Sequence, residues 1–151
     1  MNPEPAIVST GGAAALEATP STPAAIVDEF LRLLMIPDPA SAQRFVAPGL
    51  SIRFTGGRMM QDPAECAAFN ASRYRWVRKR VAVTETVAGG TPEATVVYSI
   101  GTLYGEWPDG TPFEGNAYVD RYLVSHGLIT RMEVWNDSAE WLLARAGLAT
   151  L

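Results

Sequence analysis

The strongest structural signal in the chain is the pair of strand patterns in the segment 113–136, where alternate positions separate into two distinct faces. Successive side chains of a strand point to opposite faces, so one face of the run FEGNAYVDRYLV collects Asn116, Tyr118, Asp120 and Tyr122. The opposite face collects Ala117, Val119, Arg121 and Leu123. A carboxylate flanked by two tyrosines is unusual in a plain core, and it suits the wall of a pocket.

Further strand patterns fill the C-terminal half of the chain. They cover residues 81–87, 94–104, 113–124 and 128–136, and an earlier short run covers residues 50–55. The turn signals Gly89-Gly90, Asp109-Gly110 and His126-Gly127 separate the four later runs. Because Asp-Gly between alternating runs is a strong hairpin signal, we predict an antiparallel meander.

Helical spacing dominates the N-terminal half. Ser21 or Thr22 can cap a helix with Pro23 in its first turn, and the apolar residues that follow form one face before Pro37 ends it. A short helix is predicted at residues 40–46. A third begins at Asp62, with Glu65 three residues on as in a capping box, and is predicted to run to about Lys79. A last helix is predicted at residues 138–145, with Asp137 as its N-cap.

Helices gathered before strands predict an α+β domain with the helices packed on one face of the sheet. Residues 23–151 are expected to form this single domain, whereas residues 1–22, rich in Ala, Pro and Thr, are expected to form a flexible leader. A long curved sheet folded over helices leaves a cone, whose mouth is a natural small-molecule site.

Composition narrows the classes of function. The chain has 151 residues and a net charge of −4, which argues against nucleic acid as a partner. The basic segment RYRWVRKR at residues 73–80 is therefore interpreted as the favourably charged end of the third helix.

The sequence gives little indication of a disulfide, a metal site or a membrane span. The single cysteine, Cys66, rules out an internal disulfide and a cysteine metal cluster, and it fits a reducing cytoplasm, where we expect the protein. No uncharged run reaches the ~20 apolar residues that a membrane span needs. No phosphate loop, nucleophile elbow or metal-ligand spacing occurs, so no metal or cofactor is expected.

The pattern N-x-Y-x-x-x-Y-x-x-x-x-G-x-I, which starts at Asn116, and the closing V-W-N-D, which starts at Val134, resemble the NTF2-like superfamily. Within it, SnoaL-like and ketosteroid-isomerase-like proteins are the most similar, over residues 23–147. The resemblance implies an NTF2-like (cystatin-like) cone, in which a curved antiparallel sheet wraps around N-terminal helices. It also implies a pocket on the concave face and, commonly, a homodimer through the convex face.

Carried over residue by residue, the resemblance implies a pocket lined by Asn116, Tyr118, Asp120, Tyr122, Met132, Val134 and Asn136. Arg121, Arg131 and Glu133 would lie on the outer face. Asp120 falls on the oxyanion-hole Asp of ketosteroid isomerases, an acid that stays protonated in apolar surroundings.

The other catalytic positions of that enzyme are lost, since its oxyanion tyrosine falls on Phe30 and its general base on Phe54. Phenylalanine cannot transfer a proton, which argues against ketosteroid isomerase activity. The Asp-Arg-Asp set of limonene-epoxide-hydrolase-like proteins is missing too. The only histidine, His126, lies in a predicted turn, so the pocket histidines of scytalone-dehydratase-like proteins have no counterpart.

Two classes of function remain. The first is an isomerase-, cyclase-, dehydratase- or hydrolase-type enzyme that acts on a small, largely apolar, ring-containing molecule. Asp120 would be its acid or hydrogen-bond donor, and Tyr118, Tyr122 and Asn116 would orient the substrate. The apolar wall would then consist of Phe30, Phe54 and Val134.

The second class is a non-catalytic ligand-binding or dimeric scaffold protein of the same fold. Asp120 would then be structural, held by a tyrosine hydroxyl or by Asn116, and Asn136 would help cap the last helix. An apolar patch of Ala117, Val119 and Trp135 on the convex face would serve a partner or a second copy. An open cavity that contains Asp120 would favour the first class, and a filled cone would favour the second.

Overall fold

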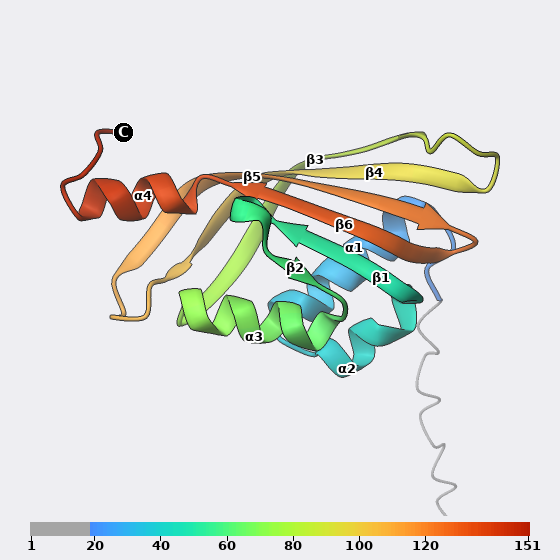
Figure 1. The fold of residues 1–151 in the computed structure, drawn as a ribbon, viewed down its shortest axis with the longest axis horizontal. Coiled ribbons are helices and arrows are strands. Elements are labelled where there is room, and N and C mark those ends of the chain that lie inside the picture. Colours follow the sequence, from blue (N-terminus) through green and yellow to red (C-terminus); the bar gives the residue numbers. More distant parts are fainter. Residues whose placement is uncertain (1–18) are drawn as a thin grey trace, which may run out of the picture.

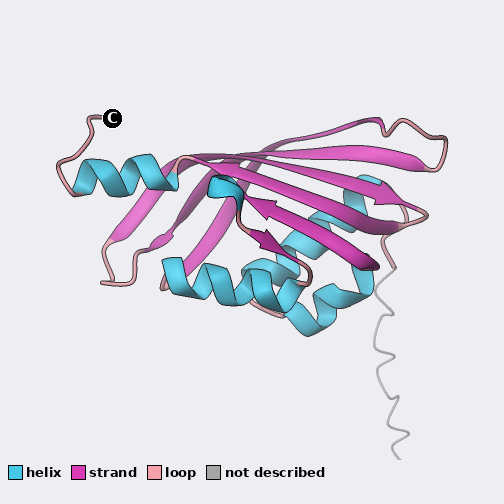
Figure 2. Ribbon diagram, viewed as in Figure 1, coloured by secondary structure: helices cyan, strands magenta, loops and turns pink. Residues whose placement is uncertain are grey.

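A computed structural model of the protein describes residues 19–151. Its centre is one curved sheet, and the first three helices lie against a single face of it (Figures 1 and 2). The helices are α1 (Pro23–Met35), α2 (Pro39–Ala42), α3 (Pro63–Arg73) and α4 (Ser138–Arg145), with 3₁₀ turns η1 (Gln43–Phe45) and η2 (Thr55–Gly57). The strands are β1 (Val46–Phe54), β2 (Met59–Met60), β3 (Trp76–Ala88), β4 (Ala94–Glu106), β5 (Pro112–Ser125) and β6 (Leu128–Asn136).

The strands are arranged in the order β2-β1-β6-β5-β4-β3, and the predicted antiparallel meander from β3 to β6 is confirmed. β1 joins the sheet beside β6 and is parallel to it. Irregularities in register accompany the bending of the long strands, for example between Val81 and Val83 in β3. At this bend β3 lies very close to Gly101 of β4, where a Cβ atom would come within 2.0 Å of the Arg80 carbonyl oxygen. Only glycine fits here without a shift of the backbone.

The first helix forms as its sequence predicts. The Thr22 hydroxyl accepts a hydrogen bond from the Ala25 N–H at 3.2 Å, Pro23 occupies the first turn, and the helix ends at Met35. Its buried face consists of Ile26, Val27, Phe30, Leu31, Leu33 and Leu34. This face packs on the concave side of the sheet and forms one wall of the core.

The third helix is shorter than predicted, and this prediction was wrong for residues 74–79. The predicted Asp62 cap forms, with the Glu65 N–H donating to Asp62 Oδ1 at 2.8 Å, whereas the Glu65 carboxylate accepts from the Gln61 N–H at 2.6 Å and not from Asp62. The helix nevertheless ends at Arg73, and Tyr74 is already extended. β3 begins at Trp76 and pairs with β4 over its whole length. These strand-pairing hydrogen bonds and the burial of Val77 outweigh the helical propensity of the basic segment. Most of that segment is therefore strand and not the end of a helix.

Smaller boundary differences occur around the second helix. The predicted helix at residues 40–46 is divided into α2 and η1, which ends at Phe45. The strand predicted at residues 50–55 is longer at its start, because β1 begins at Val46. The last helix, α4, has the predicted bounds.

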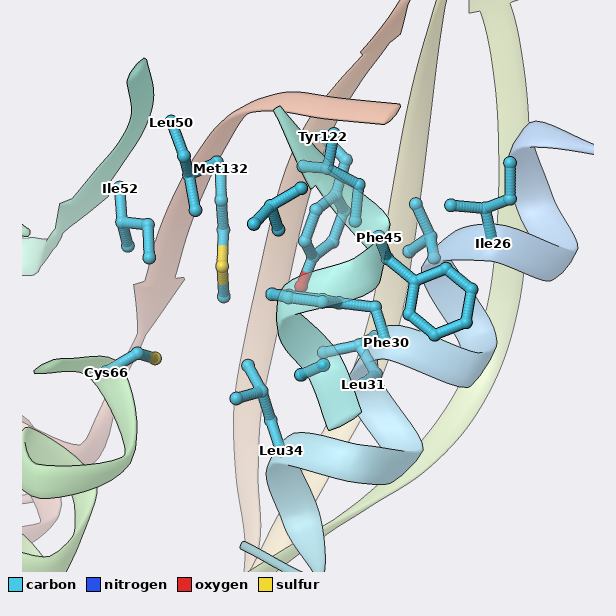
Figure 3. Packing of buried hydrophobic residues seen from close by; sticks show 14 of the residues in the cluster. Ile26, Phe30, Leu31, Leu34, Phe45, Leu50, Ile52, Cys66, Tyr122 and Met132 are labelled. Atoms are coloured by element: carbon cyan, nitrogen blue, oxygen red, sulfur yellow. The ribbon is translucent and has the colours of Figure 1, made fainter. Parts of the chain in front are cut away.

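Most of the cone is filled by apolar side chains. Figure 3 shows Phe30, Leu31 and Leu34 of α1 opposite Tyr122 and Met132 of the sheet, all of them buried. A second cluster lies around the start of β3 and the connection between β4 and β5. It consists of Tyr74, Val77, Leu103, Trp107, Phe113 and Tyr118. The candidate site lies where these two clusters meet.

Residues 1–18 of the predicted leader lie outside the described residues, and the single-domain boundary at residue 23 stays a prediction. Among residues 19–151, every helix is too short or too polar to cross a membrane.

Candidate functional site

The alternation along β5 is confirmed and places the predicted polar face inside the cone. Asn116 and Asp120 are fully buried, whereas Val119 between them is 37% exposed. On the neighbouring strand β6, Met132 and Val134 are buried and lie opposite Tyr122 and Asp120 respectively. The outer-face prediction holds as well, since Arg121 pairs with Glu133 at 2.8 Å on that side.

Asp120 has a charged partner that the sequence analysis did not identify. Lys79 of β3 forms an ion pair with Asp120 Oδ2, and the Tyr122 hydroxyl donates to the same oxygen at 2.9 Å. The Lys79 side chain is only 9% exposed, and its ammonium lies 3.9 Å from the centre of the Tyr118 ring. An ammonium and a hydroxyl that both donate to one oxygen stabilise the ionised carboxylate.

The second carboxylate oxygen of Asp120 is different. Among residues 19–151, no donor forms a hydrogen bond to the buried Oδ1 atom. Buried polar atoms are nearly always hydrogen-bonded, so such an atom calls for an explanation. Asp120 is also one of the residues that line a cavity.

The cavity lies between the concave face of the sheet, α1 and α3. Its volume is about 30 Å³, which is far below the ~300–1,000 Å³ of typical small-molecule pockets. Most of its lining is apolar, and its main polar side chains are Lys79, Asp120, Asn70 and Asn136. A neighbouring space of about 90 Å³ opens between α1, α3 and β3. The two spaces share the lining residues Leu34, Met35, Asn70, Tyr74 and Val77.

The structure brings together only part of the predicted site. Six of its residues line the cavity, namely Phe54, Tyr118, Asp120, Met132, Val134 and Asn136. Phe30 and Tyr122 instead pack against each other in the core, edge to face with their ring centres 6.2 Å apart. Asn116 does not line the cavity and belongs to a polar cluster at the start of α4, which also includes the cavity-lining residues Tyr74 and Asn136.

That cluster is centred on Ser138. Its hydroxyl is 2.8 Å from the Tyr74 hydroxyl and accepts a hydrogen bond from Asn116 Nδ2 at 3.4 Å. Asp137 occupies the predicted N-cap position of α4, but its side chain makes no capping hydrogen bond. Asn136 Oδ1 accepts from the Ser138 N–H at 3.2 Å instead. These contacts hold the start of α4 against the N-terminal part of β5.

Burial sets the protonation of the other titratable groups around the cavity. Burial and the neighbouring charge of Asp120 raise the pKa of Tyr122 well above its ordinary value. Burial also raises the pKa of Tyr118, although its hydrogen bond with Ser99 opposes this shift. The pKa of the Cys66 thiol is raised to about 12, again chiefly by burial. These three groups are therefore uncharged at neutral pH, and the ion pair of Lys79 with Asp120 is a separate, geometric feature of the cavity wall.

Lys79 is absent from the predicted site because the helix predicted from Asp62 runs to about Lys79. Extending the predicted strand at residues 81–87 back to Trp76 would have placed Lys79 on the same face as Val77, which is buried. The aromatic and β-branched residues Tyr74, Trp76 and Val77 were the available signal for a strand.

Among residues 19–151, no group of three or more His, Cys, Asp or Glu side chains is placed to hold an ion.

Comparisons with known proteins identify the fold of the chain but not its function. No family model matches the sequence, and no curated protein matches it. Solved structures do match: an NTF2-like protein from Burkholderia thailandensis E264 aligns with a TM-score of 0.64 and 20% identity, over 84% of this chain and 98% of that one. A protein with a ketosteroid isomerase-like fold from Catenulispora acidiphila DSM 44928, in complex with trimethylamine, aligns with a TM-score of 0.59 and 15% identity. The alignment covers 76% of this chain and 86% of that one.

TerC, co-crystallised with polyporic acid, gives a TM-score of 0.59 and 16% identity over 78% of this chain and 92% of that one. Identities this low establish shared architecture and leave activity open. The element order, the curved sheet and these alignments agree with the resemblance found in the sequence. The chain therefore has the NTF2-like fold.

Proposed function

We propose that this protein binds a small, largely apolar molecule between the concave face of its sheet and helices α1 and α3, with Asp120 as the polar contact. The observation that carries the proposal is that Asp120 lines the cavity while its buried Oδ1 has no donor among the described residues. An O–H or N–H group of a ligand would satisfy this atom. The mainly apolar lining would bury the rest of the ligand.

The size of the cavity limits how such a ligand can sit. A volume of about 30 Å³ accepts a polar group or part of a ring. A larger ring would extend into the adjoining space of about 90 Å³. Met35 and Asn70, which line both spaces, are only partly buried, and methionine readily changes its rotamer. A change of the Met35 rotamer would therefore widen the mouth.

The same geometry is compatible with catalysis. An ionised carboxylate in an apolar cavity can accept a proton from a bound substrate, which is the role of a general base. With Lys79 and Tyr122 both at Oδ2, an acceptor or base role for Asp120 fits better than the protonated acid that the sequence resemblance implied. Isomerisation, cyclisation, dehydration or hydrolysis of a ring-containing substrate is the reaction type that we propose for an enzyme of this kind. The ligands present with TerC and with the Catenulispora protein support small-molecule binding in this fold.

A ligand screen with two matched variants tests the proposal. Small ketones, phenols and cyclic amides are screened against the wild type by thermal shift, and dissociation constants of the hits are then measured for Asp120→Asn and Glu133→Gln. Glu133 carries the matched carboxylate on the outer face, paired with Arg121. We expect Asp120→Asn to weaken binding at least about tenfold, because a hydrogen bond to a charged group contributes ~1.5–3 kcal/mol. Glu133→Gln should bind like the wild type.

Hits that bind wild type and Asp120→Asn equally well would show that Asp120 is not a ligand contact. A complete absence of hits would contradict the small-molecule function itself.

A second candidate function, a dimeric scaffold, is favoured by the largely filled cone, which is the outcome expected for this class, and by the convex face. Val119 and Trp135 are cross-strand neighbours on β5 and β6, and they are 37% and 46% exposed. Ala117 is exposed on the same face of β5. A second copy of the chain would cover this patch, and such a dimer is compatible with a ligand in the cavity on the opposite face.

Replacing Trp135 with Ser is expected to shift a dimer to monomer in sedimentation velocity, because an aromatic residue at the centre of an interface typically contributes ~2 kcal/mol or more. Leu148→Ser is the control, since Leu148 is 75% exposed and lies beyond the end of α4. A wild type that sediments as a monomer at all concentrations would rule out this candidate.

A further inference from the structure

Lys79 offers more hydrogen-bonding capacity than its ion pair uses. A lysine ammonium has three N–H donors. Among residues 19–151, Asp120 is its only hydrogen-bonding partner, and the Tyr118 ring offers its face at 3.9 Å from the ammonium. Lys79 lines the same cavity as Asp120. The ammonium can therefore donate to a second acceptor inside that cavity.

The ion pair places this donor next to an acceptor. Lys79 contacts Oδ2 of Asp120, and the atom without a donor is Oδ1 of the same carboxylate. A hydrogen-bond donor and a hydrogen-bond acceptor therefore lie side by side on an otherwise mainly apolar wall. The complementary ligand group has an acceptor and a donor on neighbouring atoms.

We propose that the ligand presents such a neutral donor–acceptor edge, as a lactam does with its N–H and C=O or a hydroxy ketone with its adjacent oxygens. The ligand's N–H or O–H donates to Asp120 Oδ1, and its carbonyl oxygen accepts from Lys79 Nζ. This inference rests on the proposed small-molecule function and deepens it, because it names the chemical class and adds Lys79 as a specificity residue.

Other ligand classes fit this wall less well. A carboxylate would approach the ionised Asp120, and an organic cation would approach Lys79, so each would meet a like charge in an apolar setting. A simple ketone has an acceptor for Lys79 but leaves Oδ1 without a donor, and an unsatisfied buried acceptor is unfavourable. A neutral group with both functions satisfies both members of the pair.

The test uses two pairs of probes that differ only in the donor. The lactam pair is 2-pyridone with N-methyl-2-pyridone, and the hydroxy ketone pair is maltol with its methyl ether. Dissociation constants are measured by NMR titration of the wild-type full chain at pH 6, where maltol is neutral. We expect the unmethylated member of at least one pair to bind at least about tenfold more tightly. The pair that shows this preference identifies which of the two chemistries the wall accepts.

The Lys79→Met variant tests the second contact, with Arg80→Met on the exposed neighbouring position as control. The measurement is made at a temperature where circular dichroism shows the variant folded. Lys79→Met should weaken binding of the preferred probe at least about tenfold, and Arg80→Met should leave it unchanged. If Lys79→Met does not fold, the wild-type pairs still decide the proposal.

Equal affinities within each pair would overturn the donor–acceptor edge while leaving small-molecule binding in place. If neither these probes nor any compound of the wider screen binds, the proposed function fails, and this inference fails with it.

Discussion

Replacing Lys79 with Met is expected to lower the free energy of unfolding by about 3–5 kcal/mol, the usual result of removing one partner from a buried ion pair. Asp120 is fully buried, and without Lys79 the Tyr122 hydroxyl would be the one remaining donor to its carboxylate within residues 19–151. Most of the cost is therefore the penalty of a buried charge without a counterion. Urea denaturation followed by circular dichroism measures this loss.

The double variant Lys79→Met/Asp120→Leu separates this penalty from loss of packing. Removing both charges should restore much of the stability, since buried ion pairs are often replaceable by apolar residues at little cost. Arg80→Met, which breaks an exposed pair with Glu114, should change stability by less than about 1 kcal/mol. A Lys79→Met variant as stable as Arg80→Met would mean that the buried pair is not formed in solution.

Replacing Phe30 with Ala is expected to lower the free energy of unfolding by about 3–5 kcal/mol, because it leaves a void in the main core. Phe30 is fully buried on α1 and packs edge to face against Tyr122, as the close-up in Figure 3 illustrates. This expectation follows from its place in the core, whereas the sequence analysis had assigned it to the pocket wall. Ile36→Ala at the exposed end of α1 is the control, and it should lower the free energy of unfolding by less than about 0.5 kcal/mol. The comparison is made by urea denaturation of both variants.

A Phe30→Ala variant that loses little stability and gains affinity for ring-containing ligands would contradict this assignment. That result would mean that the side chain borders a pocket that ligands can enter.

The fold was largely predictable because its signals are local. Strict alternation defines β5 and β6, glycine and Asp-Gly turns separate the strands of the meander, and Thr22 with Pro23 marks the start of α1. These patterns depend on neighbours in sequence, and the chain follows them. The helix predicted across residues 74–79 failed because the pairing of β3 with β4 is a tertiary effect.

The site was only partly predictable. Alternation identified Asp120 and its two tyrosines, because the face of a strand is a local property. Its partner Lys79 is 41 residues away in sequence, on a strand two positions across the sheet, and no local pattern connects the two. The volume of the cavity depends on how Phe30, Tyr122 and their neighbours fill the cone, which follows from packing in three dimensions.

The most direct test of a ligand contact at Asp120 is a crystal structure of the protein with the tightest compound from the screen. We predict that the compound lies between α1, α3 and the concave face of the sheet, with an N–H or O–H group within hydrogen-bonding distance of Asp120 Oδ1. A compound bound elsewhere, with Oδ1 contacting only water or protein, would contradict the account.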